Sequence, residues 1–474
     1  MFIMKYLLTF ICCFILSSCF TIPDKAYREV KCKDKNTCSE VELDLLIKPV
    51  TNMVIKDGFS AYSTDDIDVN KERSEGAEIN NTSFYQFYLE YDGFGHKFDG
   101  NRQIATIERA IATSSKPVYL MVYVNSWHNN ANKEKPTKEV KYFPYILARR
   151  SFQNPDKNVI GVYIGWQGEK YKYNPAKSLL PKEVADTADR IGNNGELRTD
   201  IISLANDVQN KDQLGHSLII GKSFGGRLLS RAFMEDLTQM KSVKDWPLGS
   251  RSLLVTLNPA IGANAFDKVF KSMPGKGADV QRPVWLNMTS EDDKATNGIY
   301  SSARFIGQNL SSEPVEPGMA KTRKAIGHYV PYLSHWVTST SGVVGPDPKN
   351  NTEEDLIRCN FENVEGILKD NKSWFKIPSS IEDCATRHLY ENKLSKDDKY
   401  RYYTTTLRPL DWNKAMTAKK SLGYMWNFRI DKSIIENGSA DSRFSKGYHS
   451  ADVQTILGRM LDDMLFTPPE KPLD

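Results

Sequence analysis

The sequence lacks an excess of charge of either sign. Its 474 residues include 63 Lys and Arg against 59 Asp and Glu, which leaves a formal net charge of +4. Proteins that bind nucleic acid usually carry an excess of positive charge. Because this chain has almost none, we expect no nucleic-acid partner. The chain also lacks zinc-type spacing of Cys and His, a phosphate-binding Walker loop, heptads and internal repeats. No metal and no cofactor is implied.

The N-terminus carries an apolar run too short to belong to the fold. It reads MFIMKYLLTFICCFILSSCF, with one Lys, then apolar residues, then small residues and a cysteine. This order predicts a signal peptide over residues 1–18. Leu16-Ser17-Ser18-Cys19 resembles the lipobox of bacterial lipoproteins, which implies cleavage before Cys19 and lipid on its thiol. An ordinary cleaved signal and an uncleaved anchor helix are the alternatives.

The lipobox resemblance also implies a location. Two or more acyl chains on Cys19 would hold the chain firmly to a membrane. In the usual sorting pattern of lipoproteins, Asp directly after the cysteine is the retention signal. Phe20 stands at that position here, so the resemblance favours the outer membrane of a bacterial envelope, facing the periplasm.

Cysteine is scarce outside this leader. Seven are present, of which two leave with the signal peptide and Cys19 takes the lipid. The remaining four are Cys32, Cys38, Cys359 and Cys384. An even number in an exported chain predicts disulfides. Local pairing, Cys32 with Cys38 and Cys359 with Cys384, is the simplest of three connectivities.

Hydrophobic patterning divides the remaining chain. Residues 19–80 are charged and weakly patterned, and are predicted to be a tether and irregular lead-in. Buried or alternating runs predict strands over 83–91, 116–124, 158–166, 217–221, 251–259, 282–290 and 424–430. Helical spacing occupies 138–152, 185–209 with a break at 192–195, 227–240 and 451–465.

Buried strands that alternate with helices predict an α/β domain over residues 81–474. We expect a mostly parallel central sheet with helices on both faces. Residues 294–415 do not continue this alternation of strands and helices, and are interpreted as a long insertion or lid before the last strand. Chemistry in such sheets lies in the loops at the carboxyl ends of the strands.

Residues 214–229, LGHSLIIGKSFGGRLL, contain two serines in glycine-rich surroundings. Ser217 lies at the start of a predicted strand, away from the carboxyl edge. Ser223 lies between the strand 217–221 and the helix that begins near Arg227, within Gly-Lys-Ser-Phe-Gly. A turn this tight strains the serine backbone, and close glycines relieve the crowding. Ser223 is therefore the candidate nucleophile, with the backbone N–H of Phe224 facing an oxyanion; a structural turn is the alternative.

A serine nucleophile requires a base, and the base requires an orienting carboxylate. The strand 282–290 runs directly into Glu291, Asp292 and Asp293, any of which could serve. Candidate bases include His328 and His335 by chain order, and His449, which lies between the last predicted strand and the last helix. His96 and His128 precede the serine in loops, and His388 lies in the polar insertion.

Four motifs resemble a group of bacterial α/β-hydrolase-fold proteins. They are Asn125-Ser126-Trp127-His128-Asn129-Asn130-Ala131, residues 161–166, residues 221–226 and Thr289-Ser290-Glu291-Asp292-Asp293-Lys294-Ala295-Thr296. The resemblance covers roughly residues 83–340 and 420–465. It selects Asp293 as the orienting carboxylate and His449 as the base, although an insertion delays His449. The group has His-Gly where Asn125-Ser126 stands, and His where Lys222 stands.

The resemblance implies a membrane-anchored serine hydrolase of esterase or lipase type. Ser223, His449 and Asp293 would form the catalytic set, with Phe224 and Trp127 as backbone oxyanion donors. The substrate would be a small-molecule or lipid ester. The alternative is a catalytically inactive hydrolase fold retained as a binding or envelope-assembly lipoprotein, for which the altered Asn125-Ser126 pair argues. A tethered structural protein of the envelope is a third class.

Overall fold

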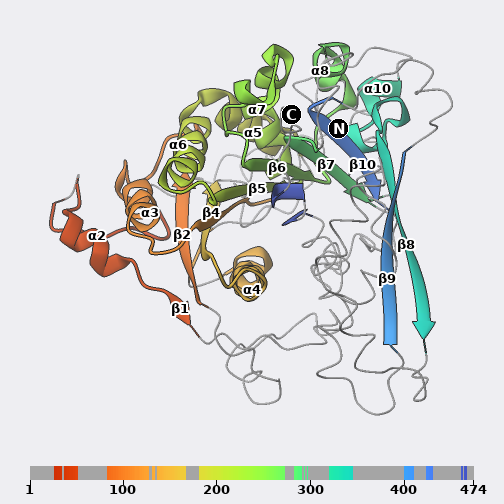
Figure 1. The fold of residues 1–474 in the computed structure, drawn as a ribbon. Coiled ribbons are helices and arrows are strands. Elements are labelled where there is room, and N and C mark those ends of the chain that lie inside the picture. The colour runs from red at the N-terminus through yellow and green to blue at the C-terminus, as the bar shows by residue number, and fades with distance from the viewer. Residues whose placement is uncertain are drawn as a thin grey trace, which may run out of the picture.

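The computed structural model describes most of the predicted domain and part of the lead-in (Figure 1). The described residues are 26–34, 37–51, 83–126, 131–133, 136–166, 181–272, 282–290, 293, 296, 320–344, 400–409, 423–430, 461–462 and 464–466. Trp127, His128, Cys359, Cys384, His388, His449 and the leader with Cys19 lie outside them. Within the described part, no helix is long and apolar enough to cross a membrane.

A ten-stranded sheet forms the centre of the molecule, in the order β1-β2-β4-β3-β5-β6-β7-β10-β8-β9. The two edge strands run antiparallel to their neighbours, and every other pairing is parallel. The bounds are β1 Val50–Thr51, β2 Ser83–Tyr91, β3 Val118–Val124, β4 Asn158–Trp166, β5 His216–Lys222, β6 Ser252–Leu257, β7 Trp285–Ser290, β8 His335–Val344, β9 Tyr400–Pro409 and β10 Met425–Ile430.

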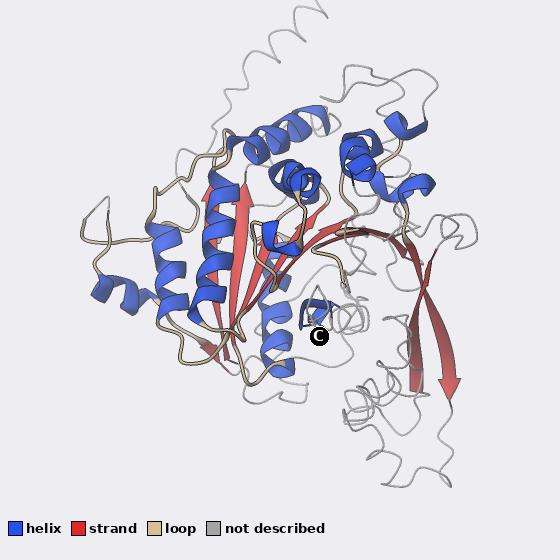
Figure 2. Cartoon of the chain, turned by 45° about the horizontal axis from the view of Figure 1, so that its top comes forward, coloured by secondary structure: helices blue, strands red, loops and turns tan. Residues whose placement is uncertain are grey.

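Helices cover both faces of the sheet (Figures 1 and 2). The main helices are α2 Glu40–Leu46, α3 Arg102–Ala112, α4 Lys138–Gln153, α5 Pro181–Asn194, α6 Glu196–Lys211, α7 Phe224–Gln239, α8 Asp267–Ser272 and α10 Ala320–Arg323. One buried cluster joins α3 and α5 to α8 to one face, and a second joins α4 and the described C-terminal helical residues to the other. Alternate residues of β3 enter the two clusters, as a strand buried on both faces requires.

The predicted α/β class and mostly parallel sheet are confirmed. The buried runs that predicted strands correspond to β2 to β7 and β10, and the helical break falls at Gly195, between α5 and α6. The sequence patterning predicts neither α3 nor the pair β8 and β9, which lies within residues 294–415 and extends the sheet through β10. The ribbon of β8 and β9 projects beyond the helices (Figure 2).

Part of the lead-in packs against the domain. Glu90, at the carboxyl end of β2, accepts the backbone N–H groups of Tyr27 and Arg28 at 3.0 and 2.7 Å. The Arg28 side chain donates to the carbonyl of Ala131 at 2.8 Å and lies over the Tyr88 ring. Farther along the lead-in, a disulfide joins Cys32 to Cys38, the local pairing predicted from the sequence.

The end of the chain closes the α4 face. Asp462 accepts from Arg150 of α4 at 2.6 Å and from the Tyr119 hydroxyl of β3 at 2.7 Å, and both partners are buried. Phe466 packs against His216, the first residue of β5. These contacts place the end of the predicted helix 451–465 at the amino edge of the sheet.

Candidate active site

Ser223 occupies the sharp turn between β5 and α7. Its backbone has φ 53° and ψ −115°, and among the described residues only Ser223 and Asn258 combine a side chain with a positive φ. Two backbone hydrogen bonds impose this conformation: the Ser223 N–H donates to Leu257 at 2.8 Å, and the Ser223 carbonyl accepts from Ala260 at 3.1 Å. Such a conformation costs of order 1–3 kcal/mol and persists because the surroundings determine it.

Two glycines allow α7 to begin directly at the sheet. A Cβ on Gly225 would collide with the backbone carbonyls of Val124 and Asn125 at the end of β3. A Cβ on Gly221 would lie 2.7 Å from the Gly225 carbonyl. Because those neighbours are backbone atoms, they cannot move aside cheaply. The glycines of the 221–225 motif therefore serve the close approach of helix and strand that the sequence predicted.

Ser223 lies at the N-terminal cap position of the sixteen-residue helix α7, and its side chain makes no cap hydrogen bond. The backbone N–H groups of the first turn and the helix dipole favour negative charge here. The predicted oxyanion donor Phe224 is the first residue of this helix. The second predicted donor, Trp127, lies outside the described residues.

A buried polar cluster ties the turn at Ser223 to the loop after β3. Glu139, in the first turn of α4, accepts the Ser126 N–H at 3.1 Å and the Ser126 hydroxyl at 2.6 Å. The same carboxylate lies 3.3 Å from the ammonium of Lys222, the residue before the candidate nucleophile. Ser126 and Lys222, two of the positions that depart from the resembling group, thus share one carboxylate.

A buried ion pair supports α7 behind the turn. Asp189 of α5 accepts from two nitrogens of Arg227 at 2.7 and 2.6 Å, and Arg231 adds a contact at 2.9 Å. Arg227 also donates to the carbonyl of Ala260 at 3.0 Å. Burial opposes charge on Asp189, but the two guanidinium groups outweigh it and hold the pKa of that carboxyl below its usual range.

Asp293 lies just beyond β7 and is buried, as expected of an orienting carboxylate. The hydroxyl of Thr296 donates to one of its carboxylate oxygens, and the Thr296 N–H donates to the other at 3.3 Å. The Nε2 atom of His328 lies 3.0 Å from the same hydroxyl. Thr296 therefore stands between Asp293 and His328.

His328 is neutral at neutral pH. Burial, assisted by the charges of Arg429 and Lys324, lowers its pKa to about 4. Because the single proton of the Thr296 hydroxyl is donated in a hydrogen bond to Asp293, the Thr296 oxygen can accept from His328 in the tautomer that carries its proton on Nε2. A base oriented by Asp293 would contact the carboxylate directly, whereas His328 reaches it through Thr296.

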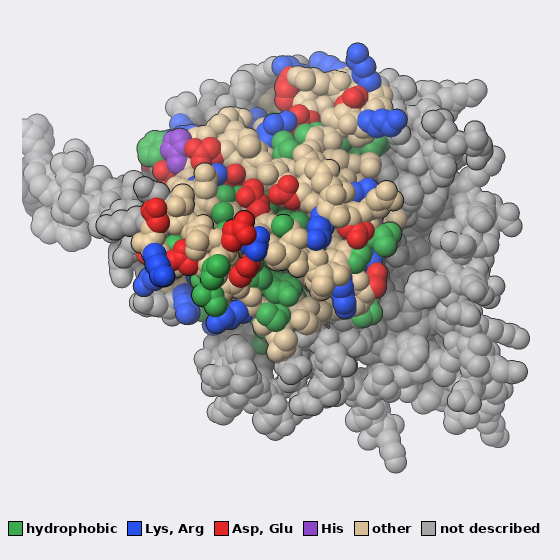
Figure 3. Space-filling view, turned by 60° about the vertical axis from the view of Figure 1, so that its left-hand side comes forward, with side chains coloured by type: hydrophobic (Ala, Val, Ile, Leu, Met, Phe, Trp, Pro, Cys, Tyr) green, Lys and Arg blue, Asp and Glu red, His purple; other side chains and the backbone are tan. Residues whose placement is uncertain are grey.

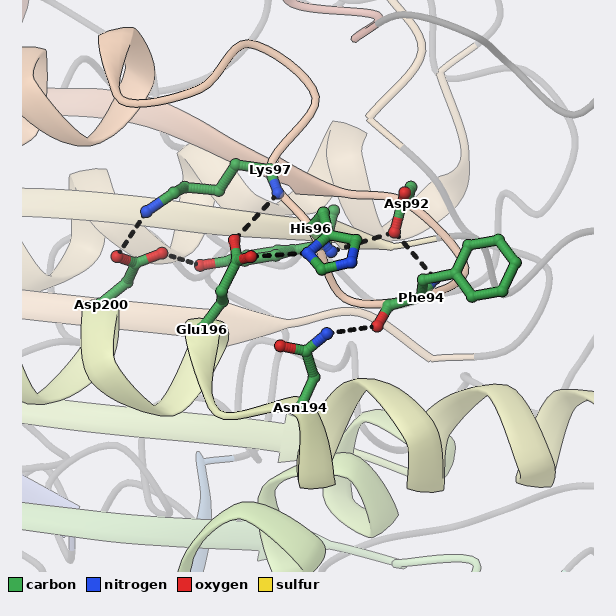
Figure 4. Close-up of polar contacts among 8 residues, drawn as sticks. Asp92, Phe94, His96, Lys97, Asn194, Glu196 and Asp200 are labelled. Carbon is green, nitrogen blue, oxygen red and sulfur yellow. Dashed lines mark hydrogen bonds and ion pairs between the residues drawn. The ribbon is translucent and has the colours of Figure 1, made fainter.

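Other predicted candidates occupy different places. Ser217 is buried near the start of β5, away from the carboxyl edge. His335 begins β8. His96 lies in the loop after β2, 2.6 Å from Glu196, where the carboxylate raises the pKa of the imidazole (Figure 4).

The surroundings of His96 hold a loop in place. Lys97 pairs with Asp200 at 2.9 Å, and Asn194 donates to the Phe94 carbonyl at 2.7 Å (Figure 4). These contacts hold the loop after β2 against the end of α5 and the start of α6. His96 itself is exposed and paired with Glu196, far from the β5–α7 turn in the strand order.

Sequence reasoning does not identify Glu139, Thr296, Asp189 or Arg227. Thr296 ends the fourth resembling motif, which is the one signal that could have drawn attention to it. Glu139 lies thirteen residues after Ser126 and eighty-three before Lys222. Residues this far apart in the chain show no sequence pattern that would predict their contact.

No protein-family model matches the chain, and no curated protein matches its sequence. Within the described part of the chain, no group of three or more His, Cys, Asp or Glu side chains is arranged to hold a metal ion.

Proposed function

We propose that the protein is a serine hydrolase of the α/β-hydrolase fold, acting on an ester through an acyl-enzyme. The observation that carries this proposal is the conformation of Ser223. A serine with φ 53° is held between a strand and a helix N-terminus by bonds to Leu257 and Ala260. Backbone strain of this kind is retained at functional sites, where a particular side chain must face the substrate. A purely structural turn could use glycine at this position and avoid the strain.

The chemistry follows from the residue types. The Ser223 hydroxyl attacks the ester carbonyl while His449 takes its proton, and the negative oxygen is stabilised by the N–H groups of Phe224 and Trp127. His449 then protonates the leaving alcohol. Water attacks the acyl group in a second round, with the proton passing through His449 back to Ser223 as the acid leaves. Asp293 orients the imidazole.

His449 remains our proposed base rather than His328. The indirect contact of His328 with Asp293 suits a residue that fixes the carboxylate through Thr296. His449 directly precedes the predicted helix 451–465, and Phe466, just after that helix, packs beside His216 of β5.

We further propose that lipid on Cys19 anchors the protein to the envelope, in the outer membrane and facing the periplasm, and that its substrate is a small-molecule or lipid ester. The lipobox-like Leu16-Ser17-Ser18-Cys19 supports the anchor. A Cys19→Ala variant should leave the membrane fraction; if it fractionates like the parent, the lipid anchor is wrong.

A binding or assembly protein without catalysis is the second candidate. The observation in its favour is that the Ser126 N–H, in the loop where a second oxyanion donor is expected, donates to Glu139. The hydrolase proposal accommodates this contact because it assigns the donor to Trp127, the next residue.

A fluorophosphonate probe tests the function directly. The intact protein should be labelled covalently, and Ser223→Ala should remove the label. Ser217→Ala is the matched control, since it changes a buried serine of the same strand and should leave labelling unchanged. Labelling that survives Ser223→Ala would place the reactive nucleophile at another residue, and an intact protein that takes no label would favour the second candidate.

A further inference from the structure

Exposed apolar side chains gather on the lead-in. Val41 and Leu45 of α2 are 70% and 67% exposed, and Leu46 and Val50 beside them are also exposed. Figure 3 views the side of the molecule that carries α2 and α3 and shows hydrophobic side chains at the surface among charged ones. We call Val41, Leu45, Leu46 and Val50 the α2 surface.

Helical geometry explains why this exposure is unusual. Successive residues of an α-helix turn by about 100°, so Val41 and Leu45 lie about 40° apart and Leu43 points to the opposite side. Leu43 is the buried residue of α2, at 7% exposure. The helix thus uses one Leu to pack on the domain and presents Val41 and Leu45 outward, where a solvated helix carries polar residues.

The α2 surface is held in place. The disulfide between Cys32 and Cys38 precedes the helix, and Ser39 and Glu42 form a capping box at its start. On the domain side, Arg109 of α3 pairs with Asp44 at 2.8 Å and with Glu40 at 3.2 Å. Glu40 and Asp44 therefore have a cationic partner although they remain exposed, and Val41 and Leu45 are held in an outward position beside them.

The chain before α2 limits how far the domain can lie from a lipid on Cys19. Ala26 is buried, and the backbone of Tyr27 and Arg28 is fixed to Glu90. Seven Cα steps separate Cys19 from Ala26, which fully extended span about 25 Å. A lipid anchored at Cys19 would therefore keep the domain next to the bilayer.

We propose that the α2 surface docks into the interface of the membrane that holds Cys19. This proposal rests on the predicted lipid attachment at Cys19. A few apolar side chains bind a bilayer weakly by themselves, but the tether makes the contact intramolecular and raises its effective concentration. The neighbouring Lys31, Lys33 and Lys48 are exposed and add attraction to anionic headgroups.

Tryptophan quenching by brominated lipid tests this contact. The lipidated, mature protein carrying Leu45→Trp would be reconstituted in phosphatidylethanolamine–phosphatidylglycerol vesicles, with and without dibrominated phosphatidylcholine. Leu214→Trp is the matched control, because Leu214 is similarly exposed, at 61%, but lies just before β5, which is four strands along the sheet from β1, the strand that follows α2. Emission is measured as the difference from the parent protein.

We expect brominated lipid to quench the indole introduced by Leu45→Trp and to spare that introduced by Leu214→Trp. Adding Val41→Asp to Leu45→Trp should restore the emission. Two results would overturn the docking proposal and leave the anchor intact. One is equal quenching of the two introduced tryptophans. The other is no quenching of the Leu45→Trp indole in protein that floats with the vesicles. If the protein carries no acyl chains by mass spectrometry and does not float with the vesicles, both the anchor and the docking proposal are wrong. Fluorophosphonate labelling of Ser223 does not depend on either result.

Discussion

At the scale of single residues, the site depends on a backbone conformation that a serine does not adopt freely. The crowding at φ 53° and ψ −115° comes from the Cβ atom, so it depends on the presence of a side chain and is independent of the hydroxyl. Stability and reactivity at position 223 can therefore be separated by two small substitutions.

Ser223→Gly should stabilise the fold while Ser223→Ala should not. Both remove the nucleophile, but only glycine removes the Cβ that makes this conformation costly. After the entropy that glycine adds to the unfolded chain, we expect a net gain of about 1 kcal/mol in the free energy of unfolding. Chemical denaturation measures the difference, and equal stability of the two variants would contradict strain at this turn.

Glu139→Gln should slow turnover more than it weakens substrate binding. The substitution keeps the shape of the side chain but removes the charge that faces Lys222 and weakens the bonds that hold Ser126. Since both carboxylate oxygens of Glu139 contact Ser126 or Lys222, we expect Glu139 to position the loop and the turn, and kcat to fall by roughly ten- to a hundred-fold, as it does when catalytic groups are slightly misplaced.

Measurement of kcat and KM separately for an ester that the parent cleaves checks the Glu139 prediction. Glu235→Gln, at an exposed carboxylate of α7, is the control and should leave both constants unchanged. A rise in KM with kcat intact would place Glu139 in substrate binding instead. Loss of stability without loss of kcat in the folded fraction would assign it a purely structural role.

At the scale of elements, α7 is attached to its neighbouring helices through two aspartates that differ in burial, Asp189, which pairs with Arg227 and Arg231, and Asp236, which pairs with Arg198. Arg227 pairs with Asp189 of α5 in the interior, directly behind Ser223. Arg198 of α6 pairs with Asp236 near the other end of α7, at 2.7 Å, with both side chains partly exposed. The comparison sets a buried aspartate with two arginine partners against a partly exposed aspartate with one.

Asp189→Asn should destabilise the protein far more than Asp236→Asn. Removing one partner of a buried pair leaves the Arg227 charge uncompensated, which typically costs 3–5 kcal/mol, whereas a partly exposed pair contributes about 0–1 kcal/mol. Thermal unfolding of the two variants measures the contrast. Similar changes in Tm would mean that Arg227 finds other compensation in the interior.

At the scale of the whole molecule, stability should depend on pH through one buried histidine, His328, and one half-buried histidine, His216. Burial lowers the pKa of both His216 and His328 to about 4. The unfolded chain binds these protons near pH 6.5 and the folded chain does not, so the free energy of unfolding should fall as the pH falls from 6.5 to 4. Each histidine contributes up to about 3 kcal/mol to this loss.

A double variant, His216→Asn with His328→Gln, should flatten the decline of Tm between pH 6.5 and 4. His96→Gln is a control with the opposite pH dependence. Because Glu196 raises the pKa of His96, this pair stabilises the folded protein below pH 6.5, and the stabilisation is lost as the pH rises. An unchanged slope in the double variant would show that other groups govern acid unfolding.

Much of the sheet could be predicted because strand burial leaves a local signal. The runs 83–91 and 158–166 coincide with β2 and β4, and the glycines around Ser223 mark the turn before α7. The helix α2 gave no such signal, because it presents Val41 and Leu45 to the outside and only Leu43 to the domain.

The sequence by itself determined the alternation of strands and helices, the turn at Ser223, the carboxylate after β7 and the local pair Cys32–Cys38, since each depends on residues close together in the chain. Only the tertiary structure decided that Glu139 joins Ser126 to Lys222, and that Thr296 separates Asp293 from His328. Those contacts arise where strands and helices distant in sequence meet at one edge of the sheet, and hydrophobic periodicity carries no information about which polar side chains meet there.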